Sequence, residues 1–293
     1  KNKGKMKSNI IGLDIGLAFG RFFLDTDDLH FGYWPDGEKP TSRNFAWAQE
    51  NHSKLIIDKI PGDAKRILDV GSGSGNLALK LLDIGYGVDC VIPSEYLAAA
   101  VQEKLNGRGK THICKFEDYI CDERYDVIIF SESFQYVKLG ESLQKIADML
   151  SPNGHLLICD FFQRNVPGKS PMGGGHSWPG FQDTIIKHPL NLVTDIDITE
   201  ETASTIDLLA KFNTDVLTPI AEMSGKYLTD HYPRLTKLLR WKFKKRLEKI
   251  QNIYLLVKII DIFFYTSFDC CWLLLNFFCH KMFKIAFVIT CLI

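Results

Sequence analysis

Three glycines at alternate positions, Gly71, Gly73 and Gly75, directly follow an apolar run at residues 67–70. A helical pattern of leucine and alanine begins immediately after them, at residues 77–82. A strand, a glycine loop and a helix in this order are typical of the first βα turn of a doubly wound α/β sheet. Glycine is needed where φ is positive or where the backbone approaches a ligand closely. The free N–H groups at the start of the helix can then bind a polar ligand.

The spacing of the glycines distinguishes between two kinds of cofactor. The pattern is G-x-G-x-G, because Asn76 stands where G-x-G-x-x-G would have its last glycine. Asp69 lies two residues before the first glycine, at the end of the predicted strand. A carboxylate in this position repels a phosphate and suits a ligand that carries an ammonium and a sulfonium group. The residues therefore favour S-adenosylmethionine (SAM) over a nicotinamide dinucleotide.

Three segments resemble motifs of class I SAM-dependent methyltransferases. They are L-D-V-G-S-G-S-G at residues 68–75, Y-D-V-I-I at residues 125–129, and L-S-P-N-G-H-L-L-I at residues 150–158, which is similar to L-x-P-G-G-x-L-L-I. Their order and spacing make the resemblance specific, and it covers residues 29–209. The resemblance implies a Rossmann-like, doubly wound α/β sheet that binds SAM and transfers its methyl group.

Composition narrows the class of substrate. Acidic and basic residues balance at 35 each, so no overall charge favours nucleic acid. The chain also lacks the N-P-P-Y or D-P-P-Y run of family members that methylate nucleic acids and protein amino groups. The eight cysteines form no C-x-x-C pair and no zinc spacing, which favours reduced thiols and no metal site. We therefore predict a small-molecule or lipid-like substrate, no nucleic acid partner, and a cytoplasmic location.

A cluster of aromatic residues, L-H-F-G-Y-W-P-D-G at residues 29–37, precedes the glycine loop; we call it the aromatic segment. It resembles the H-x-G-Y segment of methyltransferases that act on small molecules and lipids, such as the phosphoethanolamine, tocopherol and sterol enzymes. The resemblance implies that it covers the methionine end of SAM, with Tyr33 near the sulfonium. Such a cation–π contact is worth about 0.5–2 kcal/mol. The alternative is that the rings only pack over the edge of the core.

The cofactor site departs from the family pattern at one strand. The position of the acid that binds the ribose in many class I enzymes is occupied by Ile92, followed closely by Ser94 and Glu95. Glu117 and Asp118 lie where related enzymes contact the adenine amino group, or else in an ordinary solvated loop. The departure keeps one alternative open, a SAM-binding scaffold without catalysis. A nicotinamide-dependent oxidoreductase is a further rival, and the G-x-G-x-G spacing, Asp69 and the lack of a ribose-binding acid argue against it. The predicted cofactor-binding residues are Asp69, Gly71, Ser72, Gly73, Gly75, Ser94, Glu117, Asp118, Ser131 and Tyr33.

Three residues are candidates for the chemistry: Tyr33, Glu132 and His176. Glu132 follows the predicted strand at residues 125–130, at the edge where open α/β sheets bind ligands. Facing the methyl group and capping a helix are equally consistent with its position. His176 follows three glycines in a long segment at residues 163–180, and its ordinary pKa of about 6.5 suits a general base. A surface histidine on a mobile loop is the alternative.

Three parts are expected along the chain: an N-terminal lid at 1–28, a methyltransferase domain at 29–251, and a hydrophobic C-terminal tail at 252–293. A class I sheet should end in an antiparallel strand pair, but residues 253–293 show neither helical nor strand periodicity. Membrane association, a partner surface and a non-native extension are the three explanations, and we favour the last. A chain ending at Gln251 is therefore expected to remain folded.

A peripheral membrane contact through residues 234–293 follows from their charge pattern. Residues 234–249 carry eight Lys or Arg against one Glu, and the apolar tail comes next. Each basic residue near an anionic surface contributes about 1 kcal/mol. Asp261 and Asp269 would each cost roughly 2.5–3.5 kcal/mol at the centre of a bilayer. Salt-sensitive attachment, without a membrane span, is therefore the expected mode.

Overall fold

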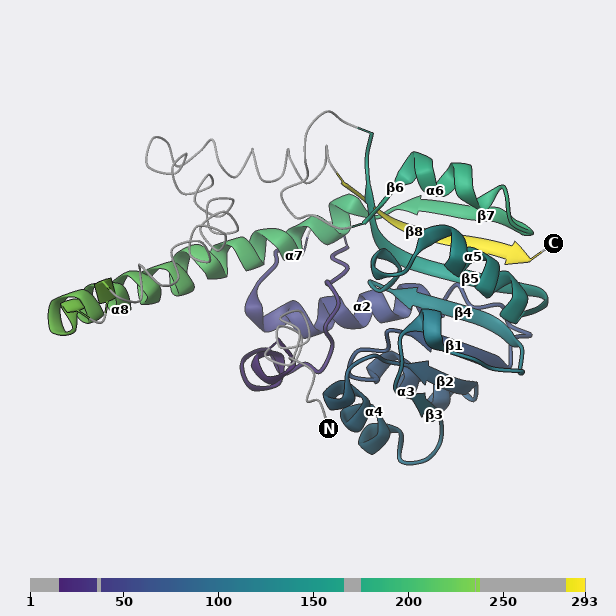
Figure 1. Cartoon of the computed structure of the whole chain (residues 1–293), viewed down its shortest axis with the longest axis horizontal. Coiled ribbons are helices and arrows are strands. Elements are labelled where there is room, and N and C mark those ends of the chain that lie inside the picture. Colours follow the sequence, from purple (N-terminus) through teal and green to yellow (C-terminus); the bar gives the residue numbers. More distant parts are fainter. Residues whose placement is uncertain (1–15, 36–37, 166–174, 235, 238–282, 293) are drawn as a thin grey trace.

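The computed structural model describes residues 16–35, 38–165, 175–234, 236–237 and 283–292 (Figure 1). One sheet has the strand order β3-β2-β1-β4-β5-β8-β7, and β6 pairs with β5 beside this path. All pairs are parallel except those of β8, which runs antiparallel to both β5 and β7. The strands are β1 (Arg66–Val70), β2 (Gly87–Val91), β3 (Lys110–His112), β4 (Tyr125–Ser131), β5 (Leu150–Gln163), β6 (His176–Ser177), β7 (Leu190–Asp197) and β8 (Phe283–Leu292).

Helices cover both faces of this sheet (Figure 1). On one face, side chains such as Ile67 and Val127 pack against α2, α3 and α4; on the other, Leu68 and Ile128 pack against α5 and α6. Successive residues of a strand point to opposite faces, so the central strands are apolar throughout. The predicted doubly wound α/β fold is confirmed. The helices are α2 (Phe45–Ile57), α3 (Asn76–Ile84), α4 (Glu95–Leu105), α5 (Leu139–Met149), α6 (Trp178–Ile185), α7 (Thr199–Phe212) and α8 (Thr218–His231).

Short helical turns lie between the main elements. They are two π-helical turns, η1 (Gly20–Leu24) and η5 (Asn213–Leu217), and three 3₁₀ turns, η2 (Ser42–Asn44), η3 (Phe116–Asp118) and η4 (Phe134–Tyr136). Of the lid expected at 1–28, residues 16–28 are described. Leu17 is buried in the core cluster of α2, α3 and α4, so this segment packs on the domain, and its role as a lid stays a prediction.

Strand β8 corrects the predicted domain boundary at 251. It lies between β5 and β7, with Leu157 opposite Ile289 on one side and Ile196 opposite Phe287 on the other. Four consecutive residues, Ile285 to Val288, are at most 2% exposed. None of the three explanations for the tail describes these residues, because they form an inner strand of the sheet. This strand is an antiparallel element that the sequence of residues 253–293 does not predict.

The predicted membrane contact through 234–293 is wrong for residues 284–289, because these residues are largely enclosed by the sheet and its helices. For residues 234–282 it stays a prediction, and 238–282 lie outside the described residues. No helix in the described part of the chain is long and apolar enough to cross a membrane.

A long helical arm leaves the sheet through α7, η5 and α8 (Figure 1). The first half of α7 is anchored, since Thr202, Ala203 and Thr205 are buried. No residue of η5 or α8 is buried by the described residues. Among the described residues, the buried side chains of the arm all belong to α7, which lies beside the aromatic segment.

We predict that a chain ending at Gln251 does not fold. Each large apolar side chain of β8 contributes roughly 1.5–3 kcal/mol by burial, and the net stability of a whole domain is only about 5–15 kcal/mol. Thermal melting followed by circular dichroism should show no cooperative transition for the truncated chain.

In the full-length chain, Phe287→Asn should lower the melting temperature strongly, because Phe287 is fully buried. Cys291→Ser, in the same strand but half-buried, serves as the matched control. A truncated chain that melts like the full-length protein would contradict the place of β8 in the core.

Candidate active site

The glycine loop lies at the carboxyl end of β1. Gly71, Gly73 and Gly75 have φ values of 77°, 54° and 81°, a region that residues with side chains rarely adopt. A Cβ on Gly71 would lie 2.5 Å from the Cβ of Ser133, so the loop touches the segment after β4. A Cβ on Gly73 would meet only Leu29 of the aromatic segment, at 3.8 Å. The loop, the end of β4 and the aromatic segment therefore meet at one place.

Two buried polar atoms at this place lack a hydrogen-bond partner among the described residues: Oδ2 of Asp69 and Oγ of Ser131. They belong to the neighbouring parallel strands β1 and β4. Burial raises the pKa of Asp69 to about 7, while the Ser72 hydroxyl and the charge of His30 act in the opposite direction. Unpaired buried polar atoms are costly. A ligand that brings an ammonium group and hydrogen bonds into this crevice, as SAM does, therefore fits the residues present.

Thr205 of α7 holds the aromatic segment in place. Its Oγ1 accepts hydrogen bonds from the backbone N–H of Gly32 at 3.0 Å and from Nε1–H of Trp34 at 2.9 Å. Both Thr205 and Trp34 are buried, and the backbone N–H of Trp34 donates to the carbonyl of Glu201 at 2.8 Å. A Cβ on Gly32 would lie 2.6 Å from Ala48 of α2, so only glycine fits there. The segment is thus fixed between α2 and α7.

Glu132 connects the aromatic segment to the end of β4. Its Oε1 accepts the backbone N–H of Phe31 at 2.7 Å, and its own N–H donates to the carbonyl of Cys159 at 2.8 Å. Its φ of 52° is unusual for a residue with a side chain and is often found at functional sites. Burial raises the pKa of Glu132 to about 7, against the opposing effects of His30 and the Phe31 N–H. The carboxylate therefore does not act as a cap of η4.

Sequence analysis missed a second buried acid, Asp160, near the carboxyl end of β5. Its two oxygens accept the backbone N–H groups of Gln135 at 2.9 Å and Phe161 at 2.7 Å. Burial raises its pKa to about 7, and the nearby charge of Glu132 contributes in the same direction. An acid within the otherwise apolar run L-L-I-C-D-F-F was the available signal.

A pair of stacked histidines lies behind the aromatic segment. The rings of His30 and His52 are 4.3 Å apart and inclined by 25°. Nε2 of His52 lies 3.1 Å from the Cys159 sulfur, and its Nδ1 has no partner among the described residues. His30 faces Asp28 and the Phe31 carbonyl. The sequence analysis assigned no role to either histidine.

The other predicted residues lie farther along the same edge of the sheet or have structural contacts. Ser94 accepts the Leu97 N–H and caps α4, while Ile92 is buried in the core. Glu117 and Asp118 form η3. Their described contacts do not link them to the glycine loop, so their roles toward a ribose or an adenine stay predictions.

His176 lies in β6, which pairs with the end of β5. Its Nε2 is 3.0 Å from the carbonyl of Phe134, which can only accept, so Nε2 carries the proton. Burial lowers the pKa of His176, and the carbonyls of Phe134 and Val137 oppose this effect. The neutral ring thus connects β6 to η4. Its role as general base stays a prediction, as does that of Tyr33, whose backbone N–H donates to the Ala48 carbonyl at 2.8 Å.

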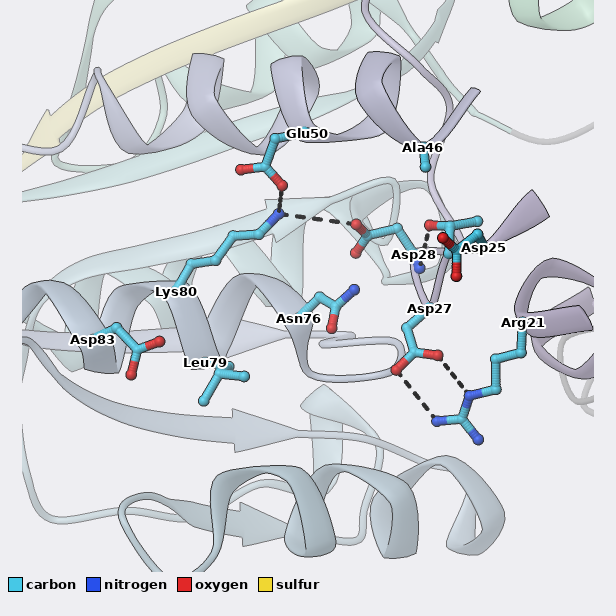
Figure 2. A pocket seen from close by; sticks show the side chains of 11 residues that line it. Arg21, Asp25, Asp27, Asp28, Ala46, Glu50, Asn76, Leu79, Lys80 and Asp83 are labelled. Atoms are coloured by element: carbon cyan, nitrogen blue, oxygen red, sulfur yellow. Dashed lines mark hydrogen bonds and ion pairs between the residues drawn. The ribbon is translucent and has the colours of Figure 1, made fainter. Parts of the chain in front are cut away.

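An acidic pocket of about 390 Å³ lies between residues 21–28, which precede the aromatic segment, and helices α2 and α3 (Figure 2). Lys80 reaches Glu50 at 2.6 Å and Asp28 at 3.9 Å, and Asp27 pairs with Arg21 at 2.6 Å. Most of its acids are thus neutralised. In the described part of the chain, no group of three or more His, Cys, Asp or Glu side chains could hold a metal ion. The acidic lining therefore gives no basis for a metal centre.

The sheet order, the antiparallel β8 and the glycine crevice together define a class I methyltransferase architecture. A family model described as "Methyltransferase domain" matches residues 42–192, which is half of the chain. The chain belongs to this methyltransferase family, and its fold is that of the SAM-dependent class I enzymes.

Known proteins with similar sequences match about a third of the chain. An uncharacterised methyltransferase of Staphylococcus carnosus is 33% identical over 113 residues, or 38% of this chain and 54% of that protein. The ubiquinone biosynthesis O-methyltransferase of Bradyrhizobium diazoefficiens is 35% identical over 109 residues, or 34% of this chain and 41% of that protein. The match thus spans about half the length of such relatives.

Solved structures are similar over almost the whole chain. Geranyl diphosphate C-methyltransferase from Streptomyces coelicolor, in complex with Mg²⁺, geranyl diphosphate and S-adenosyl-L-homocysteine, has a TM-score of 0.65 at 14% identity, covering 96% of this chain and 97% of that one. The cyclopropane synthase MmaA2 of Mycobacterium tuberculosis has a TM-score of 0.64 at 16% identity, covering 95% of each chain. At these identities the similarity establishes the fold.

We predict that Gly73→Val abolishes SAM binding, because its side chain would fill the open side of the loop. The chain should stay folded, since one residue in this backbone conformation costs roughly 1–2 kcal/mol. Isothermal titration with SAM measures the affinity. Gly107→Val is the matched control, because Gly107 has a φ of 77° and no atom within 4 Å of an added Cβ. Unchanged affinity in Gly73→Val would refute the assignment of this loop.

Thr205→Val should destabilise the protein, because it removes the acceptor of two buried donors at nearly constant volume. An unpaired buried donor costs about 1–3 kcal/mol. Denaturant unfolding should therefore show a loss of this size or more, together with weaker SAM binding as the aromatic segment loosens. Thr205→Ser keeps the hydroxyl and should behave nearly like the natural protein. Equal stability of the Val and Ser variants would show that these hydrogen bonds are unimportant.

Proposed function

We propose that this protein transfers the methyl group of SAM to a small-molecule acceptor and that Glu132 is the residue that receives a proton from that acceptor. One observation carries the proposal. The Glu132 carboxylate lies between the end of β4, next to the Gly71–Ser133 contact, and the aromatic segment, whose Phe31 N–H it accepts at 2.7 Å. A titratable carboxylate is thus held beside the predicted cofactor loop in a largely buried site.

The predicted cofactor-binding groups suit the two charged ends of SAM. Asp69 and Ser131 have unpaired atoms for its ammonium group and its carboxylate, respectively, and the glycine loop allows close approach of the backbone. When bound, SAM supplies a methyl group already activated by the sulfonium. The protein therefore contributes mainly alignment and exclusion of water. The aromatic segment, fixed by Thr205 and Glu132, covers this side of the crevice.

Glu132 is better suited to proton removal than His176. Its pKa of about 7 leaves much of the carboxylate ionised near neutrality, and only one of its oxygens accepts a described hydrogen bond. Nε2 of His176 already donates to the Phe134 carbonyl. In the proposed step the acceptor atom forms a bond to the methyl carbon, the bond from that carbon to sulfur breaks, and the acceptor's proton moves to Glu132.

The aromatic residues close to Glu132 in the fold favour an apolar, lipid-like acceptor. The Phe31 ring meets Phe161 edge-on, with centroids 5.0 Å apart, and Tyr33 packs on the same core cluster. Similar structures include enzymes named for geranyl diphosphate methylation and for cyclopropane synthesis. An apolar molecule with one polar or unsaturated group at the reacting position would fit such surroundings.

A SAM-binding scaffold without catalysis is the second candidate. It is favoured by Ile92, which is 1% exposed and replaces the ribose-binding acid of many class I enzymes. A nicotinamide-dependent oxidoreductase is the weaker alternative, because Asp69 lies at the loop where a pyrophosphate would bind. Titration with SAM and with NAD, followed by mass analysis of metabolites incubated with protein and SAM, separates the three functions.

We predict that Glu132→Gln lowers turnover at least a hundredfold, the usual contribution of a general base being about 10²–10⁴, with SAM affinity nearly unchanged. In the natural protein, turnover should rise with pH up to about 7 and then level off, because the base must be ionised. The variant's residual turnover should lack this rise. The measurement is the amount of methylated product at several pH values, with an acceptor found by mass analysis.

His176→Ala provides the comparison. If His176 only connects β6 to η4, turnover should fall modestly and keep its rise near pH 7. A Glu132→Gln variant with normal turnover, beside an inactive His176→Ala variant, would transfer the base role to the histidine. Binding of SAM without any methylated product across a broad metabolite set would favour the scaffold.

A further inference from the structure

The His30 ring has an oxygen acceptor at each of its nitrogens. Nδ1 lies 2.9 Å from the carbonyl of Phe31, and Nε2 lies 3.5 Å from a carboxylate oxygen of Asp28 and 3.4 Å from the Ser53 hydroxyl. The side chains of His30 and Asp28 are only 12% and 10% exposed. Water therefore screens the charges of this pair only weakly.

These partners select the protonation state of the ring. A carbonyl can only accept, so Nδ1 carries a proton. If Nε2 did not, its lone pair would face the Asp28 carboxylate at 3.5 Å, and only the Ser53 hydroxyl, 3.4 Å away, could donate to it. A proton on both nitrogens gives each N–H an acceptor and places a cation beside an anion. The geometry thus fits the imidazolium form.

The stacked partner His52 must then be neutral. Two imidazolium rings 4.3 Å apart would repel each other, and His52 is buried with no carboxylate among its described contacts. Burial lowers its pKa, and the charges of His30 and Lys80 contribute further. The partners of His30 act in the opposite direction, because Asp28 and Glu132 raise its pKa against the effect of burial. The surroundings of the two histidines therefore shift their pKa values in opposite directions.

The position of His30 suggests what its charge does. The groups that surround it, from every element packed against it, are Asp28 of the preceding turn, His52 and Ser53 of α2, Lys80 of α3, Asp69 of β1, and Glu132 after β4. The aromatic segment connects His30 directly to Glu132, since the next residue, Phe31, donates its N–H to that carboxylate. Fixed N–H groups and a nearby cation both stabilise the ionised carboxylate.

We propose that His30 is a permanently protonated positioning residue, held in that state by Asp28. The positive charge of His30 keeps Glu132 in the carboxylate form. The inference rests on the proposed function, because the ionised Glu132 is the proposed base. His30 itself stays charged through the reaction and transfers no proton. The donor to Glu132 is the backbone N–H of Phe31, so a neutral side chain at position 30 removes the charge and keeps this donor.

The charge of His30 can be measured without any acceptor substrate. Long-range ¹H–¹⁵N correlation spectra of the full-length protein with ¹⁵N-labelled histidine distinguish an imidazolium from a neutral ring. At pH 7, His30 should show two protonated nitrogens and His52 should show one. Spectra of His30→Gln and His52→Gln assign the signals. Asp28→Asn should convert His30 to the neutral form at pH 7. A neutral His30 in the natural protein would overturn the proposal.

The effect on Glu132 is measured by titrating the protein with ¹³C-labelled glutamate carboxyls, with Glu132→Gln as the assignment. His30→Gln should raise the midpoint of the Glu132 titration by about one pH unit, a tenfold change in its ionisation constant. His52→Gln is the matched control, because it alters the neutral ring of the same stack and should leave the midpoint unchanged. An unchanged midpoint in His30→Gln would refute the proposed coupling.

Two results keep this inference separable from the proposed function. If His30→Gln does not fold, Asp28→Asn still tests the coupling, because the loss of the imidazolium should raise the Glu132 midpoint as well. If no methyl transfer is found while both titrations give the expected result, the charge relation stands and the proposed base role fails. If transfer occurs but His30 is neutral, only the present inference fails.

Discussion

The arrangement of the site depends on four consecutive backbone N–H groups, those of residues 31–34. Each donates to a different acceptor: the Glu132 carboxylate, the Thr205 hydroxyl, and two helix carbonyls, one in α2 and one in α7. A segment with unpaired N–H groups would not remain buried, because each such group costs free energy. These bonds therefore position the aromatic segment over the crevice. They also join the sheet to the start of the helical arm.

Local sequence patterns predicted the parts of the fold that depend on local interactions. The glycine loop, α4 at residues 95–105 and the apolar strands β1 and β4 follow from backbone preference and continuous burial, which a short window of sequence contains. The position of β8 does not follow from local sequence. Its residues form an inner strand because they pair with β5 on one side and β7 on the other, and both partners lie far away in the chain.

The candidate site also contains residues that the sequence predicts and residues that it does not. Glu132 was predictable because it follows a buried strand at the edge where such sheets bind ligands. Thr205 was not, since a threonine within a helix gives no sign that two donors from another segment will reach it. The roles of His30 and Asp160 likewise arise from partners brought together by the fold. The consequences are electrostatic. Burial raises the pKa of three carboxyl groups, those of Asp69, Glu132 and Asp160, and the charge of His30 opposes this shift at Asp69 and Glu132.

The insertion of β8 also affects how the chain acquires its structure during synthesis. Strands β5 and β7 lie on either side of β8, but residues 198–282 separate β7 from it along the chain. Until that whole stretch has left the ribosome, both strands expose unpaired edges and apolar faces to other chains. Closing so long a connection is entropically unfavourable and slow. Nascent molecules of this protein therefore pass through an aggregation-prone stage, during which a chaperone that shields strand edges would raise the yield of folded protein.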